Sequence, residues 1–160
     1  MAGERFMRAG ITEFFQVPTI ASAALVPTAA EVNAGTKVTT TLAQVTGFSF
    51  ANKPIMVPDM ATTFTAQIPG RDEADSSEIE FYQLRTTDAI RTAAPKGTIG
   101  YMVIFFDGIA GATPAAGDKA DVWPMQIASN AKMYTADSEP AKYKVVYSIT
   151  KSPGIEKTLT

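Results

Sequence analysis

Residues 68–107 read IPGRDEADSSEIEFYQLRTTDAIRTAAPKGTIGYMVIFFD, and three successive patterns within them indicate three elements. In residues 78–82, acidic or polar side chains alternate with apolar ones, which is typical of a strand with one buried face. Residues 87–94 carry an apolar stripe and end at Pro-Lys-Gly, which predicts a short helix. Residues 101–106 are continuously apolar and predict a buried central strand.

Alternating side chains, or a high content of Val and Thr, predict further strands on both sides of this stretch. These are expected at residues 14–17, 37–50, 62–68, 121–130 (interrupted near Pro124) and 142–150. The two prolines in residues 52–59 exclude a central strand there, so a long loop or an edge segment is expected. Pro69-Gly70 is a strong turn signal, and residues 71–77 are expected to form an acidic loop.

The remaining segments add little regular structure. Thr28 and Glu31 have capping-box spacing, so residues 29–34 form either a short helical turn or a loop. Short strands with one short helix favour a β-sandwich or a barrel. A length of 160 residues fits a single domain, with an N-terminal arm at residues 1–13 and a C-terminal arm at residues 151–160.

The composition argues against several kinds of chemistry. The chain has no Cys and no His, so it lacks disulfides, thiolate nucleophiles, the commonest general base and the commonest transition-metal ligand. No phosphate-binding loop, dinucleotide-binding motif or serine-hydrolase motif occurs. The net charge of −2 gives no basic field that would favour nucleic acid. No apolar run approaches the ~18 residues that a membrane-spanning helix needs.

Negative charge is concentrated on one short segment. Residues 71–80 hold five acids and one Arg, a net charge of −4, whereas residues 141–160 hold four Lys and one Glu, a net charge of +3. The five acids are Asp72, Glu73, Asp75, Glu78 and Glu80. Their spacing does not match a Ca²⁺-binding loop, and solvated or partner-facing surface is favoured over a metal site or a glycosidase pair. In a self-assembling protein, the two charged segments are suited to meet between subunits.

Six segments, taken together in their order and spacing, carry a family resemblance. They are residues 27–36 (PTAAEVNAGT), 45–50 (VTGFSF), 64–70 (FTAQIPG), 74–77 (ADSS), 81–82 (FY) and 90–101 (IRTAAPKGTIGY). With them the chain resembles, over roughly residues 26–160, the major tail tube proteins of long, non-contractile-tailed bacteriophages. It is also similar to the type VI secretion tube protein.

The resemblance implies a mainly β fold, in which two packed antiparallel sheets form a β-sandwich or barrel with one short flanking helix, long loops and extended terminal arms. It implies a structural virion protein of the phage tail, assembled in the bacterial host cytoplasm, with no enzymatic activity and no cofactor. Such subunits form hexameric rings that stack into a tube, and DNA passes through its lumen without specific binding. The expected partners are further copies of the chain, the tape measure protein, the tail terminator and distal tail proteins, with no membrane.

The implied tube suggests roles for the charged residues. An acidic face repeated around a ring repels DNA, whereas a basic lumen binds DNA through counterion release. We therefore expect the five acids named above to face the lumen or the ring-to-ring contact. Charge reversal of Glu78 and Glu80 to Lys is expected to slow genome ejection while tubes still assemble. The residues expected to form an inter-ring loop are Lys53, Pro54, Pro58 and Asp59.

A different class of function also fits the strand-rich pattern. A non-enzymatic β-sandwich binding module, such as a capsid decoration protein or an adhesin, would be a discrete monomer or trimer with an exposed aromatic site. An enzyme is a third class, which the missing His and Cys disfavour. Electron microscopy of the purified protein separates the first two classes, because only a tube subunit forms tubes or rings.

Overall fold

The continuously apolar segment near residue 100 forms the centre of the fold in the computed structural model, which describes residues 7–136 and 138–160. Strand β7 (Ile99–Phe105) lies between β1 (Glu13–Val17) and β8 (Lys119–Met133), with antiparallel pairing on both sides. Its side chains are buried on both faces: Met102 and Ile104 in one apolar cluster, Val103 and Phe105 in the other. The predicted buried central strand is confirmed.

The main sheet extends outward from β7. Among the described residues, eight strands form one antiparallel sheet in the order β2-β1-β7-β8-β9-β6-β3, with β10 also paired to β8. The strands not yet introduced are β2 (Thr36–Lys37), β3 (Leu42–Thr46), β6 (Ser77–Tyr82), β9 (Lys142–Ile149) and β10 (Gly154–Thr158). Each face of this sheet carries one apolar cluster, so the sheet separates two cores.

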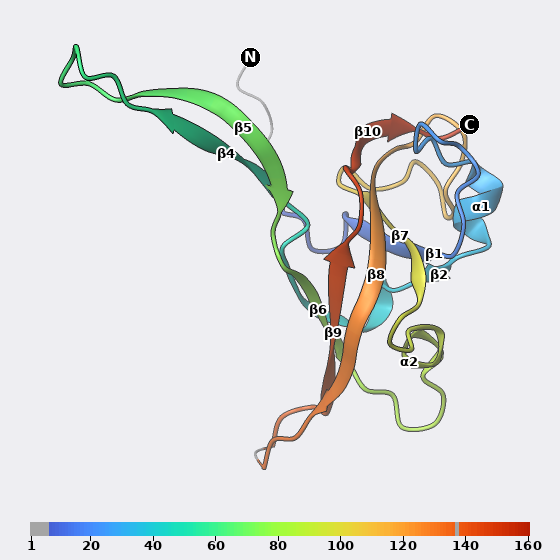
Figure 1. The fold of residues 1–160 in the computed structure, drawn as a ribbon. Helices are drawn as coiled ribbons and strands as arrows, with labels where there is room; N and C mark the ends of the chain where they lie inside the picture. The colour runs from blue at the N-terminus through green and yellow to red at the C-terminus, as the bar shows by residue number, and fades with distance from the viewer. Residues whose placement is uncertain (1–6, 137) are drawn as a thin grey trace.

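In the described residues, two short helices and one 3₁₀ turn accompany the sheet: the predicted flanking helix, and a helix at the segment 29–34, where a helical turn and a loop were both open. Helix α1 (Ala29–Asn33) contributes Val32 to the core that contains Phe105, and α2 (Ala89–Ala93) contributes Ile90 to the other core. The 3₁₀ turn η1 (Thr39–Thr41) links β2 to β3. Figure 1 shows α1 and α2 well apart along the sheet. No helix in the described part of the chain is long and apolar enough to cross a membrane.

The capping box predicted from Thr28 and Glu31 is present and begins α1. The Glu31 amide donates to Thr28 Oγ1 at 3.2 Å, and the Thr28 amide donates to Glu31 Oε2 at 2.8 Å. The Ala21 amide donates to the other oxygen of Glu31 at 2.8 Å. These backbone donors, Thr28 first, hold the pKa of Glu31 below its usual range. The predicted helix at 87–94 is confirmed in a shorter form, capped by Asp88, whose Oδ1 accepts from the Arg91 amide.

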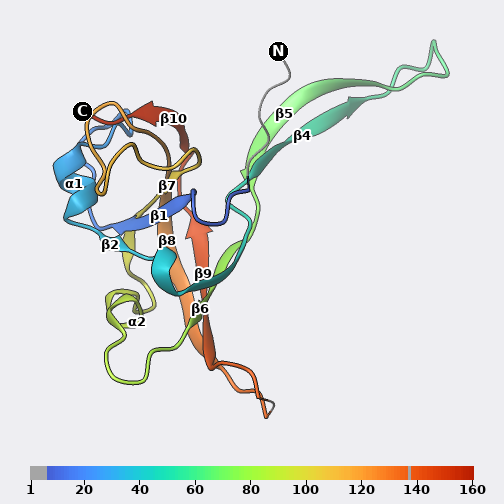
Figure 2. The ribbon, with the colours of Figure 1, turned by 180° about the vertical axis from the view of Figure 1, so that it is seen from behind.

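The second sheet is a hairpin that extends away from the first. Among the described strands, β4 (Phe50–Val57) and β5 (Ala66–Ala74) pair only with each other, and Figures 1 and 2 show them projecting far from the main sheet. The mainly β fold with two antiparallel sheets is thus confirmed, but one sheet is a small hairpin that projects away from the other. The tip of the hairpin comprises residues 58–65.

The hairpin replaces a loop and a turn that the sequence predicted. Lys53 and Pro54, predicted to lie in an inter-ring loop, lie within β4, and only Pro58 and Asp59 lie beyond its end. Pro69 and Gly70 do not form a turn. The register between the two strands shifts between Lys53 and Ile55, so Pro69 and Gly70 together lie opposite Pro54. Such a β-bulge accommodates the missing amide hydrogen of Pro54, so β5 continues through residues predicted as an acidic loop.

Strand β8 is also longer than predicted, because it continues through Pro124. The partner on one edge of β8 changes there, from β10 at Val122 to β9 at Met125. The carbonyl of Pro124 accepts from the Thr150 amide at 2.9 Å. In an antiparallel ladder, the amide and carbonyl of one residue point to the same side, so the missing N–H falls where the partner changes.

The two predicted arms are bound to the main sheet where the structure describes them. Residues 151–160, predicted as an extended arm, contain β10, and Leu159 is only 2% exposed in the core beside α1, so this segment packs against the main sheet. At the other end, the amides of Ile11 and Thr12 donate to Arg8 O, which forms a turn. Thr12 Oγ1 donates to Phe106 O at 3.0 Å. Residues 1–6 of the predicted N-terminal arm lie outside the described residues.

Docking of β10 gives a pH-dependent prediction for Asp121. Its Oδ1 accepts from the Glu156 amide at 2.7 Å, and burial raises the pKa of Asp121 above its ordinary value of 3.8 despite this bond. Because the folded state holds the proton more tightly than the unfolded state, the free energy of unfolding falls as pH rises from 3.8 through the raised pKa. Asp121→Asn keeps the acceptor and removes the charge. We expect the variant to have a higher free energy of unfolding than the unmodified protein at pH 7, and the difference to vanish near pH 3. Urea unfolding at both pH values measures this difference. A difference that does not depend on pH would contradict the prediction.

Candidate assembly surface

The β4–β5 hairpin exposes large apolar side chains that a stable monomer would bury. Seven of them between residues 50 and 68 are at least 41% exposed. They are Phe50, Ile55, Met56, Val57, Met60, Phe64 and Ile68. A two-stranded sheet is marginally stable in water unless it packs against something. Exposed large apolar side chains concentrated on one element in this way indicate a protein-interaction site.

The hairpin is fixed firmly at its root. Phe48 packs edge-on against Trp123, with ring centroids 5.9 Å apart, and its amide donates to Ser77 Oγ at 2.9 Å. The ring of Phe48 also lies 5.8 Å from that of Tyr147, whose pKa is raised by burial. At φ +51°, Phe48 has a backbone conformation that is rare for a bulky residue, so its core packing offsets a conformational cost. The direction in which the hairpin leaves the sheet is therefore set by the core.

The five predicted acids do not form one surface, because three of them lie on the hairpin or at its root. Asp72 accepts from Asn52 Nδ2 at 2.8 Å, and Glu73 forms an ion pair with Lys53, both across the β4–β5 ladder. Asp75 accepts from the hydroxyl of Ser49 at 2.6 Å where the two strands leave the main sheet. These carboxylates stabilise the hairpin locally.

Glu78 and Glu80 lie on β6, on the face opposite the buried Ile79 and Phe81, as the alternation predicted. On the neighbouring strand β9, Lys144 Nζ lies 3.0 Å from Glu78 Oε1 and 3.6 Å from Glu80 Oε1. The hydrogen bond to Glu78 is the largest cause that raises the pKa of Lys144. The acidic and basic segments thus meet, in part, within one subunit.

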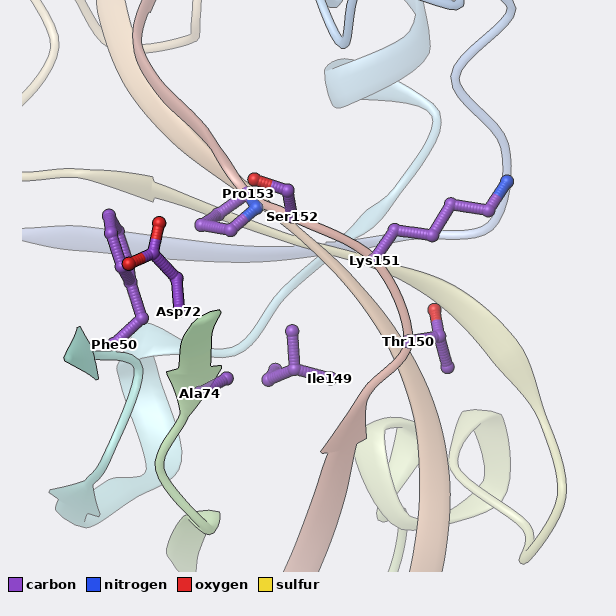
Figure 3. Close-up of a pocket in the computed structure, with 8 residues that line it drawn as sticks. All are labelled: Phe50, Asp72, Ala74, Ile149, Thr150, Lys151, Ser152 and Pro153. Atoms are coloured by element: carbon purple, nitrogen blue, oxygen red, sulfur yellow. The ribbon is translucent and has the colours of Figure 1, made fainter. Parts of the chain in front are cut away.

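A small open pocket lies where the hairpin root meets the link from β9 to β10. Its volume is about 240 Å³, and Figure 3 shows Phe50 and Asp72 on one side and residues 149–153 on the other. The side chain of Lys151 points away from Asp72 in this view. The polar side chains that line the pocket are those of Asp72, Thr150, Lys151 and Ser152. Across residues 7–136 and 138–160, no group of three acidic side chains is placed to hold a metal ion.

Sequence patterns missed the apolar character of the hairpin. The run Ile55-Met56-Val57 lies between two prolines, which argued against a strand, and apolar residues there face both ways instead of alternating. One feature of the sequence does indicate it. The large apolar residues Met60 and Phe64 lie among residues typical of exposed turns, and no predicted strand is placed to bury them.

Comparisons with known proteins agree with a tail component. A family model described as phage tail tube protein matches residues 1–160. The fold is similar to that of a chain in the 6-fold symmetrised cryo-EM structure of the anti-feeding prophage baseplate, with a TM-score of 0.59. That match has 5% sequence identity and covers 94% of this chain and 95% of the other, so it shows a shared fold. A comparison with curated protein sequences found no match. From the match over its full length, this chain belongs to the phage tail tube protein family.

Proposed function

We propose that this chain is the repeating subunit of the tail tube of a long, non-contractile phage tail. Copies form hexameric rings, and the rings stack into a hollow conduit through which the genome leaves the virion. The observation that carries the proposal is the projecting hairpin, whose seven exposed apolar side chains are not covered by any other part of the chain that the structure describes. Because the hairpin is one part of the surface and its receptor another, the contact is heterologous and can propagate.

The main sheet supports the same proposal through its edge. Strand β3 ends the sheet order, so among the described strands only β6 pairs with it. An unpaired strand edge is a hazard for a monomer and a pairing site for a neighbouring copy. In this proposal, the hairpin makes the contacts between rings. The predicted inter-ring role of Lys53, Pro54, Pro58 and Asp59 is kept, with the first two residues in β4 and the last two in the tip of the hairpin. The tape measure, tail terminator and distal tail proteins are proposed partners at the inside and ends of the tube.

Negative-stain electron microscopy of the purified protein over a concentration series tests this function. We expect rings or hollow tubes, with tubes more frequent as the protein concentration rises. A monodisperse monomer or trimer at every concentration and salt would overturn the proposal and favour the decoration-protein or adhesin class.

The face of β6 and β9 that carries Glu78 and Glu80 is proposed to line the lumen. Lys144 neutralises part of the charge of these two carboxylates, so repulsion of DNA by this face is weaker than Glu78 and Glu80 alone would give. The combined variant Glu78→Lys and Glu80→Lys places four Lys on this face, together with Lys142 and Lys144 of β9. We expect tubes to assemble and genome ejection to slow, because a basic lumen retains phosphate through counterion release.

Ejection kinetics of virions that carry the variant check this, with added salt expected to restore the rate. The matched control reverses two exposed acids away from β6, Glu139→Lys and Glu156→Lys, for the same change in net charge. Equal slowing by both variants, or slowing that salt leaves unchanged, argues that these two residues do not face the channel.

A further inference from the structure

An apolar groove lies at the open seam of the curved main sheet. It runs between the turn at residues 8–12, strand β3 and the end of β7, and its volume is about 620 Å³. Its apolar walls are formed by Phe14, Leu42, Val45, Phe48, Ile104 and Phe106. A cavity of this size lies within the range of ~300–1,000 Å³ that is typical of binding pockets, so it has room for more than one apolar side chain.

Among the described residues that line the groove, Arg8 is the only charged one. The guanidinium lies 4.7 Å from the centroid of the Phe106 ring, which places it over the apolar wall at the mouth of the groove. No acid is among the residues that line the groove. A complementary occupant is therefore apolar with one negative charge.

The tip of the hairpin has this composition. Residues 58–65 read PDMATTFT, in which Asp59 is the only charged residue. Met60 and Phe64 are the most exposed apolar residues of the hairpin, at 106% and 77%. The Ala61 amide donates to Asp59 Oδ1 at 2.8 Å, which holds the carboxylate in the turn beside Met60.

The tip cannot enter the groove of its own subunit. Phe48 lines the groove and also forms the root of the hairpin, and the eight residues of β4 extend about 26 Å away from that root. Figures 1 and 2 show the tip far from the turn at residues 8–12 and from β3. A second copy of the chain must supply the tip.

We propose that the groove of each subunit receives the hairpin tip of a second copy, with Met60 and Phe64 against its apolar walls and Asp59 facing Arg8. This proposal rests on the tube function, for which it names the receiving surface. Donor and receptor are different parts of one chain, so each copy offers one tip and one groove and the contact repeats along the tube. The groove of a second copy then covers the hairpin tip, which is exposed in a single subunit.

A charge swap tests the pairing. Arg8→Asp and Asp59→Arg each place like charges at the contact, and we expect each to raise the protein concentration needed for tube formation at least tenfold. The combined variant restores opposite charges and is expected to recover most of the loss. Pelleting and electron microscopy measure assembly, and circular dichroism confirms that each variant is folded. Glu139→Arg, in the loop between β8 and β9, is the matched control and is expected to assemble normally.

A cross-link locates the contact directly, because the chain has no Cys of its own. Ala43→Cys lies in the groove and Met60→Cys at the tip, so oxidised tubes of the combined variant are expected to give a ladder of multimers on a denaturing gel. Tubes that form normally with either single charge variant, or tubes without a ladder, would overturn the groove assignment while the tube function stands. Failure of the unmodified protein to form tubes instead counts against the tube function itself.

Discussion

Replacing Gly47 by alanine is expected to destabilise the fold by roughly 3 kcal/mol. Gly47 has φ +85°, in the left-handed region, where an L side chain costs about 1–2 kcal/mol. An added Cβ would also lie against the carbonyl of Ser76 and 2.6 Å from the Cα of Ser77, so the backbone of β6 would have to move. The same movement disturbs the hydrogen bond from the Phe48 amide to Ser77, so the root of the hairpin is weakened.

The control for this substitution is Gly97→Ala. Gly97 also has positive φ, at +91°, but an added Cβ meets nothing within 4 Å. Its variant is expected to lose only about 1 kcal/mol, from the backbone alone. Urea unfolding of both variants gives the two free energies, provided the slope with denaturant is unchanged. Equal losses would mean that close packing of Gly47 against β6 contributes nothing.

Excising the hairpin is expected to abolish tube formation while the main sheet stays folded. The amide of Asp75 donates to the carbonyl of Ser49 at 2.9 Å, so these two residues already pair like the ends of a hairpin. An Asn-Gly turn in place of residues 50–74 is suited to join them without altering the strands on either side. The excised residues carry the exposed apolar surface and few buried side chains, so little core is lost.

Size-exclusion chromatography and thermal unfolding measure the two expectations for the excision variant. It should elute as a monomer or a single ring and keep its unfolding temperature within a few degrees. Tubes formed by this variant would show that contacts other than the hairpin hold successive rings together. A loss of folding would instead show that Phe50, which lies 6.2 Å from Trp123, contributes to the core.

The main-sheet strands could be predicted from the sequence where burial has a simple period. Strand β6 alternates Glu78, Glu80 with Ile79, Phe81, and the structure buries only the apolar pair. Strand β7 reads as a continuous apolar run because it is buried on both faces. The capping box of α1 was readable because its side-chain and backbone bonds are local in sequence.

The hairpin and the ends of the chain could not be predicted in the same way, because their structure depends on partners distant in sequence. Pro69-Gly70 signals a turn in isolation, and only pairing with β4 turns it into a bulge opposite Pro54. Pro124 taken alone predicts a break in the strand, but β8 continues through it because the neighbouring strand changes there from β10 to β9. The five acids looked like one patch because they are close in sequence, but Lys53 and Lys144 reach them from other strands.

A cryo-EM reconstruction of the purified, assembled protein would show whether it forms a tube of stacked rings. We expect six subunits in each ring, a continuous channel, and the β4–β5 hairpin buried between successive rings with its tip in the groove beside Arg8. A protein that stays monomeric at all concentrations, or that forms closed particles in which the hairpin remains exposed to solvent, would contradict this expectation.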